Sequence, residues 1–129
     1  MMQTRDHSTG PATCRVRRCT AMPSSLHESV REVACLHVPA SEQGLGYATA
    51  LMHNVCREAD AAGIVLVLWP QPYGEDTAMD RDQLQHWYAR RFGFAVVQPE
   101  PLMMAREPGA TPRLLRLNPV VEAMARDNA

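Results

Sequence analysis

The sequence predicts an α/β (α+β) domain, in which a mixed β-sheet with one central parallel strand pair is flanked by two main helices. An apolar run ends at Val38, and a turn with two glycines and an amphipathic stretch over residues 46–62 follow it. A second apolar run covers residues 64–69. A strand, a helix and a strand within about 40 residues form a βαβ unit, whose crossover is almost always right-handed. We therefore expect the two strands to be parallel.

The first strand is expected in the middle of the sheet. Its last residues are apolar on both sides, with Val33 and Cys35 on one face and Ala34, Leu36 and Val38 on the other. A strand that is apolar on both faces is typical of a buried position. Before it, residues 1–25 are expected to be a short N-terminal segment. Residues 1–13 are polar and predict disorder, while residues 14–20 alternate weakly and predict an edge strand.

Both helices carry start or stop signals. Apolar residues of the first helix recur three or four apart, at Ala48, Leu51, Met52, Val55, Ala59 and Ala62. Gly63 and Gly93 supply the left-handed residues that end helices. Asp80 and Gln83 form a capping box before a second helix over residues 81–92.

The rest of the chain completes the sheet. Strands are expected over residues 94–98 and 102–106, antiparallel to each other, and residues 26–108 then form the core. Residues 109–129 form a tail with weak helical periodicity over residues 114–125, where Pro119 suits the first helical position.

Composition excludes several classes of protein. The chain has 129 residues, enough for one domain, and 46% of them are hydrophobic, enough for a core. Its net charge of −1 without a basic stripe predicts no nucleic-acid partner. No apolar run has membrane-spanning length, and residues 1–21 lack the apolar centre of a signal peptide. We therefore expect a cytoplasmic protein without a membrane partner.

Metal binding is not expected. The chain has four cysteines but no CxxC pair, so a zinc ribbon is excluded. His53 and Cys56 on the first helix have no further ligands beside them in the sequence. Cys35 and Cys56 are interpreted as small buried hydrophobes, and Cys14 and Cys19 pair only in an oxidising compartment.

The glycine turn at residues 43–48 is the candidate functional element. Free backbone N–H groups at a glycine turn and a helix N-terminus bind phosphate. A glycine, any residue and a second glycine also occur by chance, so the turn alone is better explained as a tight strand-to-helix connection, and only its context favours a phosphate site.

Two motifs resemble those of the GCN5-related N-acetyltransferases (GNAT family). Gln43-x-x-Gly46-x-Ala48 fits the family signature Gln/Arg-x-x-Gly-x-Gly/Ala. The second is an aromatic segment, Trp87-Tyr88-Ala89-Arg90-Arg91-Phe92-Gly93-Phe94, which is similar to the family's aromatic-Tyr segment before Gly-Phe, one residue longer than its commonest form. Residues 103–108 resemble the last strand of small members, so the resemblance covers residues 30–108.

The resemblance implies a site for acetyl-CoA as co-substrate, with no metal. The pyrophosphate would lie on the N–H groups of residues 44–48, and the pantetheine arm along the end of the first strand. The implied cofactor-binding residues are His37, Val38, Gln43, Gly44, Leu45, Gly46, Tyr47 and Ala48. The backbone N–H near Val38 would hold the developing oxyanion.

The resemblance also implies catalytic groups. Tyr88 occupies the general-acid position for the leaving thiolate, although it also lies on the apolar face of its helix. Glu32 matches the catalytic glutamate of the histone-acetylating branch, although an exposed strand-end carboxylate is the simpler explanation. His37 is a further candidate base, and many members use water instead.

Three hypotheses follow. The first is an N-acetyltransferase that moves an acetyl group to a primary amine of a small molecule or peptide by direct attack. The second is a non-catalytic acyl-CoA-binding or protein-interaction module with the same fold, and the third is a small structural protein. Family members carry two helices before the central strand, and this chain is too short for them there. A second subunit, the residue 114–125 helix or nothing would then wall the acceptor side, so a homodimer is one expectation.

Overall fold

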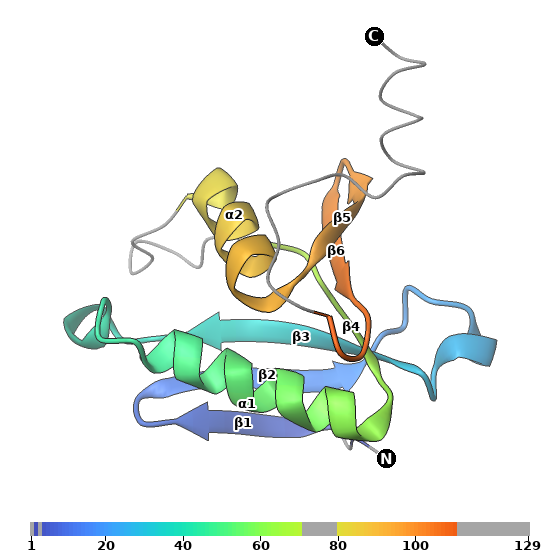
Figure 1. Cartoon of the computed structure of the whole chain (residues 1–129), viewed down its shortest axis with the longest axis horizontal. Helices are drawn as coiled ribbons and strands as arrows, with labels where there is room; N and C mark the ends of the chain where they lie inside the picture. Colours follow the sequence, from blue (N-terminus) through green and yellow to red (C-terminus); the bar gives the residue numbers. More distant parts are fainter. Residues whose placement is uncertain (1, 3, 71–79, 111–129) are drawn as a thin grey trace, which may run out of the picture.

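The computed structural model describes residues 2, 4–70 and 80–110, which form one six-stranded mixed sheet with two α-helices (Figure 1). The sheet has the strand order β1-β2-β3-β4-β6-β5. Only β3 and β4 are parallel neighbours, which confirms the predicted fold class. The elements are β1 (Arg5–Thr9), β2 (Ala12–Arg18), β3 (Val30–His37), α1 (Tyr47–Ala62), β4 (Val65–Leu68), α2 (Arg81–Phe92), β5 (Ala95–Pro99) and β6 (Leu102–Arg106).

The βαβ unit is built from β3, α1 and β4, as predicted. The apolar stripe of α1 is buried against the sheet through Leu51, Met52, Val55, Cys56 and Ala59. Gly63 ends the helix in a left-handed conformation with φ +68°. Ile64 then donates its N–H to the Ala59 carbonyl over 2.9 Å, which turns the chain directly into β4.

The second helix is fixed at its start by the predicted capping box. Gln83 donates its backbone N–H to Asp80 Oδ1 over 2.8 Å, and Asp80 donates its N–H to Gln83 Oε1 over 2.9 Å. Gly93 ends the helix with φ +81°. The antiparallel pairing of β5 with β6 is also confirmed.

The core lies on one side of the sheet, because both helices pack on that side. It joins α1 and α2 to alternate residues of the strands, such as Val16, Leu66 and Met104. Figure 1 shows α1 lying over β1 and β2, with α2 beside the β5–β6 hairpin. The opposite face carries a smaller apolar cluster, which we call the open-face cluster. Its buried members are Cys19, Val30, Val67 and Met103, and its half-buried members are Met22, Val65, Trp69, Val97 and Ala105.

The N-terminal region differs from the prediction. Residues 5–9, expected to be disordered, form β1 and pair with β2 in a hairpin that turns at Gly10. As a result β2 is an interior strand and not an edge strand, because it lies between β1 and β3. The hydrophobic signal is weak because the outer face of the hairpin is charged, with an ion pair between Arg15 and Asp6 at 2.8 Å.

The positions of Cys14 and Cys19 show whether these two residues form a disulfide. Cys14 and Cys19 are buried in clusters on opposite faces of the sheet and form no disulfide. Burial raises the pKa of the Cys14 thiol to about 12 and that of Cys56 to about 11, so both stay protonated near neutral pH. Cys56 therefore behaves as the predicted small hydrophobe.

Within residues 2, 4–70 and 80–110, no helix is long and apolar enough to cross a bilayer. The same residues contain no group of three or more His, Cys, Asp or Glu side chains that could hold a metal ion. The helix predicted over residues 114–125 lies outside the described residues.

Candidate functional site

The start of α1 is a helix N-terminus without a side-chain cap. The N-cap residue is Gly46, with φ +86°, and it makes no side-chain capping hydrogen bond to the first turn. The first turn also contains no acidic residue. The first N–H groups of a helix have no intrahelical partner and carry a partial positive charge. The N–H groups of Tyr47, Ala48 and Thr49 are therefore placed to bind an anion.

Backbone conformation explains why glycine stands at two positions of this turn. Gly44 and Gly46 have φ of +79° and +86°, in the left-handed region that other residues rarely adopt. A Cβ built on either residue meets no atom within 4 Å. The space around both glycines is thus open, and a large group can approach the backbone there.

The loop before α1 is held closed by one side chain. Gln43 Nε2 donates to the Val38 carbonyl over 3.1 Å, which ties the end of β3 to the start of the helix. The predicted ligand Gln43 is therefore engaged in positioning the turn. Leu45, between the two glycines, is 64% exposed. The Tyr47 ring packs over the β1–β2 turn, where a Cβ on Gly10 would lie 2.7 Å from it.

A β-bulge interrupts β3 just before the turn. Thr13 pairs with His37 and Arg15 with Ala34, so β3 carries one extra residue between these pairs. Cys35 has φ +57°, which is unusual for a residue other than glycine. The bulge resets the alternation, so that Leu36 and Val38 join the same core as Val33. Cys35 is consequently exposed, which corrects the prediction that it is a buried hydrophobe.

The parallel strands β3 and β4 pair over a short length only. Val30, Arg31 and Glu32 lie opposite Val65, Leu66 and Val67. Beyond this point β3 continues to His37, whereas β4 ends at Leu68. Over the last residues of β3, the edge that faces β4 therefore makes no ladder hydrogen bonds with β4. An extended ligand can pair there as a strand would, and the line of β3 leads it to the glycine turn.

Comparison with known proteins agrees with this geometry. The model of the acetyltransferase (GNAT) family matches residues 12–94, more than half of the chain. The chain belongs to the GNAT family. This assignment supports acyl transfer from acyl-CoA in general. It also confirms the resemblance that the two sequence motifs indicated.

The fold has a solved counterpart. The crystal structure of the anti-CRISPR protein AcrVA5 superposes with a TM-score of 0.60 at 12% sequence identity. The match covers 82% of this chain and 100% of that chain. At this identity the likeness shows a shared fold. A search of curated proteins returned no match.

Tyr88, the predicted general acid, lies on the inner face of α2. It is 5% exposed and belongs to the core on the helix side of the sheet. Its ring makes edge contacts with Trp87, with centroids 4.9 Å apart, and with Phe94, at 5.5 Å. The structure thus shows the core role that the sequence left open, and a core position is compatible with an acid role.

Glu32 lies on the opposite face of the sheet from Tyr88. It follows Val30 by two residues on β3, so both point to the open face. Its Oε2 atom is 3.0 Å from Arg17 Nη2, and its side chain is 16% exposed. It is therefore a mid-strand, ion-paired carboxylate and not an exposed strand-end group. The sheet separates the two predicted catalytic residues.

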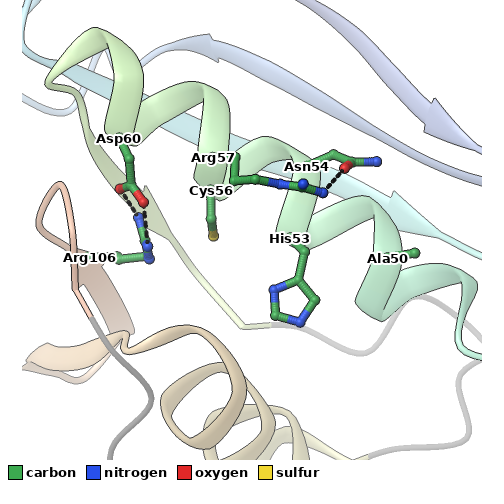
Figure 2. Close-up of a pocket in the computed structure, with 7 residues that line it drawn as sticks. All are labelled: Ala50, His53, Asn54, Cys56, Arg57, Asp60 and Arg106. Atoms are coloured by element: carbon green, nitrogen blue, oxygen red, sulfur yellow. Dashed lines mark hydrogen bonds and ion pairs between the residues drawn. The ribbon is translucent and has the colours of Figure 1, made fainter.

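A groove of about 510 Å³ beside α1 was not indicated by the motifs (Figure 2). It is lined by Ala50, His53, Asn54, Cys56, Arg57, Asp60 and Arg106. Its charged groups are mostly partnered, because Arg57 bonds to Asn54 over 2.6 Å and Arg106 is paired with Asp60. Arg106 lies 46 residues after Asp60 in the sequence, so no local pattern could have placed it beside the α1 residues of this groove.

The ion pair at the end of this groove fixes the C-terminal half of α1. Arg106, almost fully buried, donates to Asp60 Oδ1 over 2.7 Å and to the Phe92 carbonyl over 2.7 Å. Gly109 donates its N–H to Asp60 Oδ1 over 2.7 Å. The bond from Arg106 lowers the pKa of Asp60, and the Gly109 N–H acts in the same direction. This network joins both helices to β6.

Proposed function

We propose that this GNAT protein is an acetyl-CoA-dependent N-acetyltransferase that moves the acetyl group to a primary amine by direct attack. The observation that carries the proposal is the start of α1. The first N–H groups of α1 have no side-chain cap, and two glycines with left-handed backbone precede them. Both features follow the end of β3, which is no longer paired with β4 there. The acceptor is a small molecule or a peptide, and the protein acts in the cytoplasm.

Each predicted cofactor residue receives a role that its position supports. The backbone N–H groups of residues 44–48 bind the pyrophosphate, where favourable charge contacts contribute roughly 0.3–1 kcal/mol each. Gln43 holds the turn through its bond to the Val38 carbonyl. His37 and Val38 offer backbone groups to the pantetheine arm beside the bulge. The backbone N–H near Val38 stabilises negative charge on the thioester oxygen.

Proton transfers complete the proposed reaction. The amine nitrogen bonds to the acetyl carbon, and the carbon–sulfur bond breaks. Tyr88 gives its phenolic proton to the leaving thiolate. The proton lost by the amine passes to Glu32 or to water. Since Glu32 is paired with Arg17 on the open face, the acceptor would approach from that face.

A non-catalytic acyl-CoA-binding module is the second candidate. Tyr88 is packed in the core and Glu32 is ion-paired, so each has a structural role without catalysis. Release of free thiol from acetyl-CoA, measured against a panel of primary amines, separates the two candidates. An enzyme releases thiol with at least one amine beyond the rate without amine. Cofactor binding without release across small amines and lysine peptides would favour the module.

The matched pair Tyr88→Phe and Tyr47→Phe tests the acid. Loss of a general acid lowers turnover by roughly 100- to 10,000-fold. We expect this loss for Tyr88→Phe, with the dissociation constant of acetyl-CoA little changed. Tyr47→Phe should retain turnover because its ring packs on the β1–β2 turn. Equal turnover of Tyr88→Phe and the parent protein would contradict the acid role.

A further inference from the structure

One row of residues crosses the open face of the sheet and changes from charged to apolar on the way. Arg17 on β2 lies opposite Glu32 on β3, and Glu32 lies opposite Val67 on β4. Val67 in turn lies opposite Ala105 on β6. Both belong to the open-face cluster, as does Trp69, which follows Val67 by two residues. Glu32 is therefore a carboxylate at the boundary between a charged strand and an apolar surface.

The same row marks the point where β3 and β4 separate. Glu32 with Val67 is the last of the three paired positions of these strands, and β3 then continues to His37. In the proposed function the thioester of acetyl-CoA lies along this continuation of β3. An amine that binds beside Glu32 on the open face therefore lies next to the edge on which the acetyl group is held.

We propose that the amine acceptor is a free α-amino acid with an apolar side chain, an inference that rests on the proposed function. The carboxylate of the amino acid binds Arg17, and its ammonium group binds Glu32. Its side chain lies on Trp69 and Ala105. Among the described residues both helices pack on the other face of the sheet, so the acceptor approaches from the side opposite to them.

The spacing of the two charges selects this class of amine. Arg17 Nη2 and Glu32 Oε2 are 3.0 Å apart, and the Arg17 side chain is 44% exposed. This bond uses one of the five N–H donors of a guanidinium group, so Arg17 can bind a second carboxylate. A ligand that pairs with both residues carries its own opposite charges similarly close together. An α-amino acid does so, because its ammonium and carboxylate groups share one carbon. A lysine side chain or a polyamine has no acid beside its amine.

The apolar side chain of the acceptor follows from the other neighbours of Glu32. Trp69 and Ala105 are half-buried, so both retain surface that a ligand can cover. Adjacent strands lie about 4.8 Å apart, which separates β2 from β4 by about 10 Å. An amino acid the size of leucine or phenylalanine fits this row with its carboxylate at β2 and its side chain at β4. Each methylene group removed from water strengthens binding roughly fourfold, so larger apolar side chains are favoured.

The reaction with an amino acid balances in atoms and charge. The ammonium group first gives one proton to Glu32 or to water. The amine nitrogen then bonds to the acetyl carbon, the carbon–sulfur bond breaks, and the nitrogen loses a second proton. Of these two protons, one replaces through solvent the proton that Tyr88 gives to the thiolate, and the other is released to water. The products are an N-acetyl amino acid and free coenzyme A.

Matched acceptors test the inference on the unaltered chain. Release of thiol from acetyl-CoA is measured with leucine, leucinamide, alanine and a lysine peptide. Leucinamide keeps the amine and the side chain but lacks the carboxylate charge. We expect kcat/KM for leucine to exceed that for leucinamide roughly 10- to 100-fold, the effect of one charge-assisted hydrogen bond. Leucine should exceed alanine by roughly tenfold, because its side chain covers more apolar surface.

Arg17→Gln and Arg18→Gln are a matched pair of variants. Arg18 is the next residue on β2, and it pairs with Glu28 instead of Glu32. We expect Arg17→Gln to bring the ratio of kcat/KM for leucine to that for leucinamide close to one, whereas Arg18→Gln keeps the ratio of the parent protein. Because both acceptors are measured on the same sample, a partly unfolded variant still reports the ratio.

Three results would overturn the inference and leave the proposed N-acetyltransferase standing. They are equal kcat/KM of the parent protein for leucine and leucinamide, an unchanged ratio in Arg17→Gln, and release with the lysine peptide but not with leucine. Release of thiol with none of the amines would instead contradict the proposed function, and this inference would fall with it.

Discussion

The two helices of this protein begin in opposite ways. α2 begins with a complete capping box between Asp80 and Gln83, and Asp82 adds a negative charge to its first turn. α1 begins at Gly46 with neither a side-chain cap nor an acidic residue. A helix start that is satisfied by its own side chains stabilises the fold, whereas one left open can bind an anion. The capping box stabilises the start of α2, whereas the proposed function assigns the uncapped start of α1 to a ligand.

The other end of α1 compensates for its open start. Gly63 closes the helix with bonds to the carbonyls of Ala59 and Asp60. Asp60 is held by Arg106 and by the Gly109 N–H. α1 is thus secured at its C-terminus and free at its N-terminus. Stability and proposed binding are assigned to different ends of one helix.

Among the substitutions that test the contrast between the starts of α1 and α2, an acidic residue in the first turn of α1 should have the largest effect. Ala48→Glu places a carboxylate in the first turn of α1, close to where the pyrophosphate would bind. Repulsion of about 1.4 kcal/mol, within the range for charges a few ångströms apart near a surface, lowers affinity about tenfold. Titration calorimetry with acetyl-CoA measures it. Ala61→Glu, at the exposed far end of the same helix, is the control and should retain affinity.

Removing the cap of α2 should have a smaller effect, and on stability only. Asp80→Ala deletes the side chain that accepts the Gln83 N–H. Loss of an N-cap costs about 1 kcal/mol in the free energy of unfolding. Urea denaturation of the variant and the parent gives this difference. An unchanged free energy of unfolding, or a loss of acetyl-CoA affinity as large as that of Ala48→Glu, would break the contrast between the two starts.

The smallest expected effect is on the acid dependence of stability. Arg106 and Gly109 lower the pKa of Asp60 below its ordinary value of 3.8. A carboxylate with a depressed folded pKa stabilises the fold above 3.8 and loses this contribution as pH falls through the folded pKa. Asp60→Asn should therefore flatten the decline of stability below about pH 4. Thermal unfolding across that pH range tests it, with Glu58→Gln on the same helix as the control.

Local patterns were sufficient to predict the elements around the site. The bounds of α2 and its capping box follow from Asp80, Gln83 and Gly93, which act within one turn of their own positions. The parallel pair follows from the handedness of the crossover between apolar runs. The glycine turn was also predictable, because left-handed backbone selects glycine at residues 44 and 46.

Register and long-range pairing were not predictable. The bulge at Cys35 depends on how β2 lies against β3, and nothing within β3 marks it. β1 was missed because Arg5 and His7 face Glu58 on α1, so that its buried side is polar in sequence. The ion pair of Glu32 with Arg17 joins two strands that are 15 residues apart in sequence. These features depend on partners that only the folded chain brings together.

The two glycines at the ends of α1 provide the most direct test. Gly46 and Gly63 have φ of +86° and +68°, and a Cβ on either meets open space. A leucine at either position therefore introduces similar backbone strain, on the order of 1–2 kcal/mol. Calorimetric titration with acetyl-CoA compares Gly46→Leu with Gly63→Leu, after circular dichroism shows that both are folded. We expect Gly63→Leu to bind acetyl-CoA like the parent protein and Gly46→Leu to show no binding heat. Equal affinity of the two variants would contradict it, because the phosphate would then bind elsewhere.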